Sequence, residues 1–356
     1  MAYFVLLIWL AVGLRRSLPP IGATKDAAQE PISIIIAARN EENNLARLLT
    51  SIAQLEPIEA DYEVIIVNDH SRDESLEILR KWEGQFGIRV IDHQERMPGF
   101  VGKKAALQKG IEAAKYDILA FTDADCKLPP TWLKEISRVM DNETDYILGY
   151  STIYRNDADT DLRLENFERS AYFILAAAGI AHRKPITSSA CNMIYRKSLF
   201  EKSGGFEGIS EIRSGDDDLL LMKMMPNIRK AYYNPSRYMQ VDCFEKRDFE
   251  TVHNKRIRQA SKFKYHPRFV QVLSAMIFIY FAMFYVGLIS LFFPSRSLII
   301  LIAITLKFIF ELTLSQRHLA LAKKTHIGIL YFMYVVAFPL QYLFYAIRGT
   351  LGKYKW

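Results

Sequence analysis

Cysteine is scarce in this sequence of 356 residues. Only Cys126, Cys191 and Cys243 occur, and they form neither a Cys-x-x-Cys pair nor the even framework of a disulfide-rich secreted domain. Scattered thiols of this kind predict no zinc site, and they indicate a reduced compartment that faces the cytosol.

Motifs for binding nucleic acid, or a nucleotide in a Walker loop, are also missing. The chain has a formal net charge of +7, but no RNA- or DNA-binding motif accompanies the basic residues, so we expect no nucleic acid partner. The Gly-x-x-x-x-Gly-Lys-Ser/Thr spacing of a P-loop is absent. The basic excess therefore favours an anionic membrane face and phosphate-bearing substrates.

Hydrophobic residues make up 50% of the chain and gather at its two ends. Residues 2–14 are apolar and uncharged, and Arg15 and Arg16 follow them. This run is shorter than the roughly 20 residues that span a bilayer, and its charges follow the apolar core, whereas those of a signal peptide precede it. The start of the chain therefore predicts a short membrane anchor with its arginines on the cytoplasmic side.

Three further apolar segments end the chain, at 269–293, 297–314 and 327–347. The first is long enough to span a membrane. The second contains Lys307 and Glu311, which lie four residues apart on one helical face and could pair. The basic residues between the segments decide neither the number of spans nor their orientation.

These changes in composition divide the chain into five parts. We expect a membrane anchor at 1–16, a linker at 17–30, a soluble domain at 31–245, a basic amphipathic helix at the membrane interface at 246–268, and a transmembrane region at 269–356. The chain is therefore predicted to be an integral protein of the inner (plasma) membrane, with membrane lipids as partners and its soluble domain in the cytoplasm.

Strands and helices alternate in the soluble part. Strands rich in β-branched or large apolar residues are predicted at 31–40, 62–68, 118–123 and 186–195, and helical patterns stand between the first three. Such alternation predicts an α/β fold with a mostly parallel, doubly wound sheet. The segment at 161–179 is predicted to be an amphipathic helix that lies against the bilayer or against an acceptor, or a helix that packs on the sheet.

The strand at 118–123 ends in two carboxylates, Asp123 and Asp125. Ligand sites of open α/β sheets lie at the carboxyl ends of strands, and two hard oxygen donors so close together suit Mg²⁺ or Mn²⁺, which would hold a diphosphate. Turn-forming aspartates after a strand are the alternative interpretation.

Polar residues follow the first two strands as well. Arg39 and Glu41 could bind a base and a ribose, or could form an ordinary surface ion pair. Asp69 follows the second strand and could cap the next helix. Lys103 begins a helix after glycines, where backbone amides already favour anions, whereas the neighbouring Lys104 is expected to be solvated.

Three adjacent carboxylates, Asp216, Asp217 and Asp218, precede a leucine-rich segment. Their mutual repulsion should raise at least one pKa toward the range of a general base. Favourable charge at a helix N-terminus is the alternative explanation, and it accounts better for one or two aspartates than for three.

Taken together, these motifs resemble the family-2 glycosyltransferases, which are membrane-attached inverting enzymes with a nucleotide-diphospho-sugar-binding α/β domain, the GT-A fold. The resemblance covers roughly residues 31–262. It is carried by the segments Ile-Ile-Ile-Ala-Ala-Arg-Asn-Glu-Glu from Ile34, Val-Asn-Asp from Val67, Gly-Lys-Lys-Ala-Ala-Leu from Gly102, the Asp-x-Asp at 123–125 and the Asp-Asp-Asp at 216–218.

The resemblance implies a role for each matching residue. Ala37, Arg39, Glu41, Asp69, Lys103 and Asp123 would bind the UDP-sugar, and Asp125 with Asp123 would hold Mg²⁺ or Mn²⁺. Asp217 would be the base that deprotonates the acceptor, with Asp216 in place of the usual Glu. Arg258 would face the diphosphate, although Lys255 and Gln259 replace the Gln and Trp of the family's Gln-x-x-Arg-Trp.

We therefore expect a metal-dependent hexosyltransferase of the cell envelope that moves a sugar from UDP to a lipid-linked or saccharide acceptor. A processive polysaccharide synthase is the first alternative, against which the altered Gln-x-x-Arg-Trp counts. An inactive sugar-nucleotide sensor or scaffold subunit is the second. The sequence specifies neither the sugar nor the acceptor.

Overall fold

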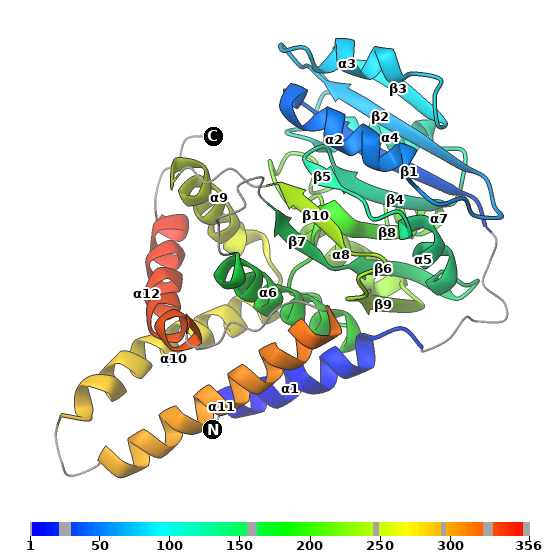
Figure 1. Cartoon of the computed structure of the whole chain (residues 1–356). Helices are drawn as coiled ribbons and strands as arrows, with labels where there is room; N and C mark the ends of the chain where they lie inside the picture. The colour runs from blue at the N-terminus through cyan, green and yellow to red at the C-terminus, as the bar shows by residue number, and fades with distance from the viewer. Residues whose placement is uncertain are drawn as a thin grey trace.

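The computed structural model describes residues 2–20, 30–154, 162–244, 249–292, 297–322 and 330–351. Parts of the sequence-based predictions lie outside these ranges, namely most of the linker (21–29), the boundary at 245–248 and the start of the third apolar segment at 327–329. Within the described residues, an α/β domain is joined to a group of long apolar helices (Figure 1).

The centre of the domain is a seven-stranded sheet in the order β3-β2-β1-β4-β8-β6-β9. Its strands are β1 (Ile32–Ala38), β2 (Tyr62–Asp69), β3 (Ile88–His93), β4 (Ile118–Asp123), β6 (Thr144–Gly149), β8 (Met193–Arg196) and β9 (Lys230–Asn234). All neighbours pair in parallel except β8, which runs antiparallel to both β4 and β6. The predicted mostly parallel α/β sheet is thus confirmed.

Helices cover both faces of this sheet, as its almost uninterrupted apolar strands require. One face packs against α2 (Glu42–Ala53), α3 (Ser75–Trp82) and α5 (Trp132–Val139). The other packs against α4 (Lys104–Ala113), α6 (Arg163–Ala181) and α8 (Asp218–Met224). A short helix, α7 (Lys197–Lys202), follows β8.

A second sheet of three short strands lies at the edge of the domain in the order β5-β10-β7. These strands are β5 (Cys126–Lys127), β7 (Ser151–Tyr154) and β10 (Val241–Phe244). Since only two residues separate Asp123 at the end of β4 from Cys126 at the start of β5, the small sheet stands beside the carboxyl end of the central strand.

The strand predicted at 186–195 is wrong in its first part. Residues 186–189 are irregular and Ala190–Asn192 form a 3₁₀ turn, so that only Met193–Arg196 pair in the sheet. The reason is Asn192, whose side-chain amide donates to the carbonyls of Tyr150 and Met239 and whose Oδ1 accepts from the indole of Trp132. This buried side chain bonds backbone groups in place of a strand ladder.

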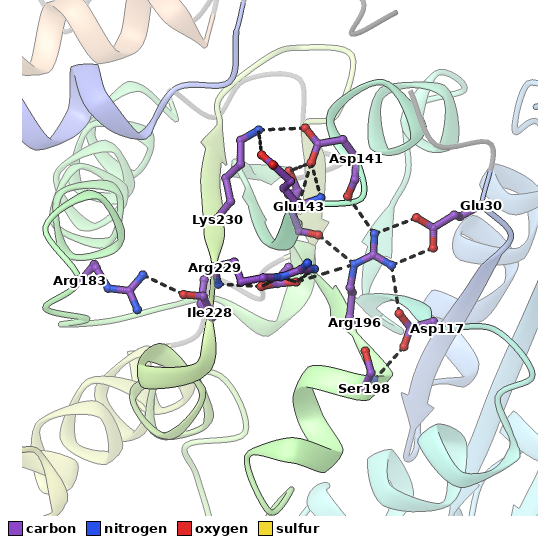
Figure 2. Close-up of polar contacts among 12 residues, drawn as sticks. Glu30, Asp117, Asp141, Glu143, Arg183, Arg196, Ser198, Ile228, Arg229 and Lys230 are labelled. Atoms are coloured by element: carbon purple, nitrogen blue, oxygen red, sulfur yellow. Dashed lines mark hydrogen bonds and ion pairs between the residues drawn. The ribbon is translucent and has the colours of Figure 1, made fainter. Parts of the chain in front are cut away.

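A cluster of charges around Arg196 ties together the sheet end opposite Asp123 (Figure 2). The Arg196 side chain is 7% exposed and lies 2.8 Å from a Glu30 oxygen and 3.0 Å from an Asp117 oxygen. It also donates to the carbonyls of Thr144 and Asp141. One guanidinium therefore joins the ends of β4, β6 and β8.

The apolar helices are α1 (Ala2–Ser17), α10 (Arg268–Ser290), α11 (Ser297–Leu321) and α12 (Leu330–Leu351), and α9 (Phe249–Ser261) with a 3₁₀ turn at Lys262–Tyr265 leads into them. In the described part of the chain, two helices are long and apolar enough to cross a membrane, Arg268–Ser290 and Leu298–Leu321. Their outward side chains are apolar and exposed: Met283 is 66% and Ile299 75% exposed. Such surfaces are typical of contact with lipid.

The helix predicted at 161–179 packs on the sheet, which is one of the placements that the sequence left open. α6 contacts α1, α11 and β9 and lies between the sheet and the apolar helices (Figure 1). The contact between α1 and α6 is close because a Cβ atom on Gly13 would come within 2.5 Å of the Cα of Ala178. The predicted pair in α11 is confirmed, with Lys307 Nζ 2.7 Å from Glu311 Oε2.

Candidate active site

The carboxyl ends of the parallel strands open into a cavity of 1710 Å³. Every residue that the sequence singled out lines it: Ala37, Arg39, Glu41, Asp69, Lys103, Asp123, Asp125, Asp216, Asp217 and Arg258. These residues are far apart along the chain, and they meet because the strand ends of a parallel sheet share one edge.

The loops after β1 and β2 are tied to each other at one side of the cavity. Asn40, with a φ of +55°, accepts a hydrogen bond at its Oδ1 from the backbone N–H of Arg72 over 2.8 Å. Asp69 is buried, and its two oxygens lie 2.7 Å from the His70 Nδ1 and 4.0 Å from an Arg39 nitrogen. These contacts hold the Asp69 carboxylate at the cavity wall.

Lys103 stands between two groups of acids. Its Nζ contacts Asp123 and lies 3.5 Å from an Asp216 oxygen. Burial opposes the positive charge, but the two carboxylates outweigh it and raise the pKa of Lys103. A permanent cation therefore lies where the end of β4 faces the loop before α8.

The Asp125 carboxylate lies close to other negative charges. Burial, followed by the charges of Asp123 and Glu41, raises its pKa to about 7. A bound divalent cation would relieve this repulsion, and paired carboxylates are the donors that Mg²⁺ and Mn²⁺ prefer. The side chains of Asp123 and Asp125 thus fit the cation that the sequence predicted.

The three adjacent aspartates differ in state. Asp217 is the N-cap of α8, since its Oδ1 accepts from the N–H of Asp218 over 2.7 Å. Burial raises the pKa of Asp217 to about 8; Lys262 opposes this rise, while the neighbouring Asp218 and Asp216 add to it. For Asp218, burial acts upward, but Lys262 and His266 outweigh it and lower the pKa. Asp217 therefore both caps α8 and has a raised pKa, so the two explanations that the sequence offered for the aspartates hold together.

Lys104 is not solvated, contrary to the sequence-based prediction. It is 1% exposed, and its Nζ donates to the carbonyls of Ile212 and Ser214, the latter over 2.8 Å. The segment before Asp216 folds over α4 and leaves these carbonyls without a strand or helix partner, so the lysine satisfies them.

Lys262 and His266 belong to the site although the sequence did not indicate them. Lys262 Nζ contacts Asp218 and lies 3.8 Å from an Asp217 oxygen, and His266 Nε2 lies 3.6 Å from Asp218. Lys262 lies four residues, or about one helical turn, after the exposed Arg258. This spacing from a predicted site residue is the sequence signal that could have placed Lys262 in the site. The segment that leads into α10 is thereby fixed to the aspartate loop.

The three cysteines, scattered in sequence, converge beside the cavity. Their Sγ atoms all lie within 4.8 Å of one another, and Cys191 and Cys243 line the wall next to Asp125. The sequence pattern did not predict this cluster, because its three cysteines come from separate elements.

Comparison with known proteins agrees with this architecture. Residues 33–204 match the family described as glycosyl transferase family 2. The undecaprenyl-phosphate 4-deoxy-4-formamido-L-arabinose transferase of Aeromonas hydrophila is 31% identical over 133 residues, which cover 37% of this chain and 39% of that protein. Glycosyltransferase AglE of Haloferax volcanii is 26% identical over 189 residues, or 52% of this chain and 58% of that protein.

The matched regions thus span only about two fifths to three fifths of these curated relatives. Among solved structures, the mannosyltransferase PcManGT from Pyrobaculum calidifontis, in complex with GDP-Man and Mn²⁺, covers 96% of this chain and 91% of its own. Its TM-score is 0.58 at 18% sequence identity. This likeness confirms that the fold is GT-A-like.

Proposed function

Because residues 33–204 match the family described as glycosyl transferase family 2, we propose that the chain is a metal-dependent, inverting, membrane-bound glycosyltransferase. It would transfer a sugar from a UDP-sugar to a hydroxyl group of a lipid-linked or membrane-delivered acceptor. One observation carries this proposal: a single cavity joins the carboxylates at the strand ends to an apolar passage between the helices.

The polar end of the cavity suits the donor. Arg39, Glu41 and Asp69 would bind the base and ribose of UDP. Lys103 and Arg258 would face the diphosphate, where fixed cations stabilise the charge that develops on the leaving group. Asp123 and Asp125 would hold a divalent ion, which supplies Lewis-acid stabilisation of that diphosphate when bound.

Asp217 would act as the general base. A pKa of about 8 lies in the range where a carboxylate can accept a proton efficiently near neutral pH. The acceptor oxygen attacks the anomeric carbon from the face opposite the UDP, its proton passes to Asp217, and the bond from the anomeric carbon to the diphosphate oxygen breaks. One such displacement inverts the configuration.

The other end of the cavity suits a lipid. Its walls there are mainly apolar and come from α1, α10 and α12, including Leu7, Phe278, Phe281, Phe338 and Tyr342. The Lys307–Glu311 pair of α11 is the charged part of this lining. A saccharide needs polar partners along its length, whereas an isoprenoid or acyl chain needs apolar walls. The passage thus favours an acceptor whose lipid stays between the helices.

A lipid phosphate is the second candidate acceptor. The Aeromonas hydrophila relative is named for undecaprenyl phosphate, and the apolar passage would accept such a chain equally well. A phosphate oxygen is already ionised at neutral pH and needs no base, so the Asp217→Asn variant separates this acceptor from a hydroxyl. A processive synthase and an inactive sensor remain less favoured.

The test is release of UDP by the full chain in nanodiscs, measured over a panel of UDP-sugars with Mn²⁺, Mg²⁺ or EDTA, and with or without lipid extract. Metal-dependent release from one sugar that rises with lipid is expected. UDP binding without release from any sugar would favour the sensor, and absence of UDP binding would contradict the assignment of the donor site.

A further inference from the structure

The three cysteines of this chain meet at one point from three different elements. Cys126 in β5 and Cys243 in β10 are directly opposite in the antiparallel register, with their Sγ atoms 3.1 Å apart. Cys191 enters from the 3₁₀ turn before β8, and all three Sγ atoms lie within 4.8 Å of one another. The exposed fractions are 0% for Cys126, 4% for Cys191 and 8% for Cys243.

A positive charge is fixed against these sulfurs. Arg169 of α6 places its Nη2 3.6 Å from the Cys191 Sγ and 3.5 Å from the Cys243 Sγ. Its Nε is oriented by a 2.8 Å hydrogen bond to the Ser151 carbonyl. A guanidinium in this position can donate hydrogen bonds to thiolate ligands, and three thiolates buried together would need a cation among them.

We propose that Cys126, Cys191 and Cys243 bind one zinc ion through three thiolate sulfurs. Zinc–sulfur bonds of about 2.3 Å at tetrahedral angles separate the sulfurs by about 3.8 Å. All three sulfur pairs here lie within 4.8 Å, and the 3.1 Å contact between Cys126 and Cys243 would widen by about 0.7 Å. Three thiolates and Zn²⁺ carry a net charge of −1, which Arg169 neutralises. Hydrogen bonds from outer groups to metal ligands are typical of such sites.

This site is distinct from the predicted site of the catalytic cation and does not depend on the proposed function. Asp123 and Asp125 offer hard oxygens that suit Mg²⁺ or Mn²⁺, whereas thiolates select zinc and other soft ions. Cys126 directly follows Asp125, so a zinc ion would join β5, β10 and the turn before β8 into one rigid wall. Its role would be to hold that wall, and with it Asp125, in place.

The experiment measures zinc, iron, copper, nickel and manganese in the full chain, purified in detergent without chelator, by inductively coupled plasma mass spectrometry. The expected result is one zinc per chain, with zinc lost in Cys191→Ser and retained in the matched control Asp123→Asn, which removes a hard ligand only. Thiols are counted in parallel by Ellman's reagent in denaturant, with and without EDTA.

If Cys191→Ser does not fold, replacement of zinc by Co²⁺ in the wild-type chain gives a second readout, because cobalt thiolates show an intense near-ultraviolet charge-transfer band. Zinc at equal levels in wild type and a folded Cys191→Ser, or three free thiols with no bound metal, would overturn the proposal. One titratable thiol with the other two oxidised would overturn it in favour of a disulfide pair.

Discussion

At the scale of single residues, Asp217 and Asp218 are adjacent and carry opposite pKa shifts. Asp218 is 3% exposed and contacts Lys262, so its charge is compensated. Asp217 lies 3.8 Å from the same lysine and faces the cavity. Neighbouring charges therefore give two identical side chains different states, one with a lowered pKa and one with the raised pKa expected of the proposed base.

Asp217→Asn should lower the turnover of a hydroxyl acceptor by about 10²- to 10⁴-fold, the range typical of a lost general base. The residues proposed to bind the donor and the metal are others, so UDP-sugar binding should stay nearly unchanged. Turnover is measured by UDP release and binding by calorimetry. Glu211→Gln on the same loop, exposed to solvent, is the control. Near-normal turnover in Asp217→Asn would show that this base assignment is wrong.

Lys262→Met should move the pH dependence of transfer. The lysine charge holds down the pKa of Asp217, which burial otherwise raises. A base works deprotonated, so the rate should rise with pH through about 8 in the wild type and at higher pH in the variant. Lys264→Met, an exposed lysine two residues on, should leave the profile in place. Identical profiles in all three proteins would contradict the coupling.

Asp125→Ala should weaken the metal-dependent part of nucleotide binding. The loss should be about tenfold or more, since even the outer partners of a metal ligand contribute about 10–100-fold. Calorimetric titration of UDP with Mn²⁺ and with EDTA measures the difference between the two conditions. Asp61→Ala, at an exposed carboxylate, serves as control. The role of Asp125 would be refuted by an unchanged response to Mn²⁺.

At the scale of elements, the sequence predicted the strands and the polar residues at their ends because both signals are local. β1, β2 and β4 each combine an apolar run with an abrupt polar end. Lys262 and the cysteines were missed because their partners are distant in sequence: Lys262 pairs 44 residues away and Cys126 meets Cys243 across 117 residues. Lys104 was misjudged for the same reason, since its partners lie more than 100 residues on.

Arg196→Leu should destabilise the domain by about 3 kcal/mol, the lower end of the range for removing one partner from a buried ion pair. The variant would leave Glu30 and Asp117 without their shared guanidinium (Figure 2). Thermal unfolding midpoints in detergent give the comparison. Arg80→Leu breaks the exposed pair with Glu83 and should change stability by less than about 1 kcal/mol. Equal midpoints for the two variants would contradict this ranking.

At the scale of the whole molecule, the proposed acceptor reaches the site along the helices and not through bulk water. With the amounts of enzyme, donor and lipid acceptor fixed, added detergent should therefore lower the rate in proportion to the mole fraction of acceptor in the micelles, as long as the acceptor is not saturating. UDP release over a detergent series measures this. A rate that followed only the bulk concentration would exclude delivery through the apolar passage.

The pairing of α1 with α11 also bears on biosynthesis. The Tyr3 hydroxyl donates to Glu311, 308 residues later in the chain. A ribosome adds about 5–20 residues per second, so α1 emerges on the order of half a minute before its partner exists. During translation α1 is thus an unpaired apolar segment, and the membrane or a chaperone must keep it from aggregating until α11 has been made.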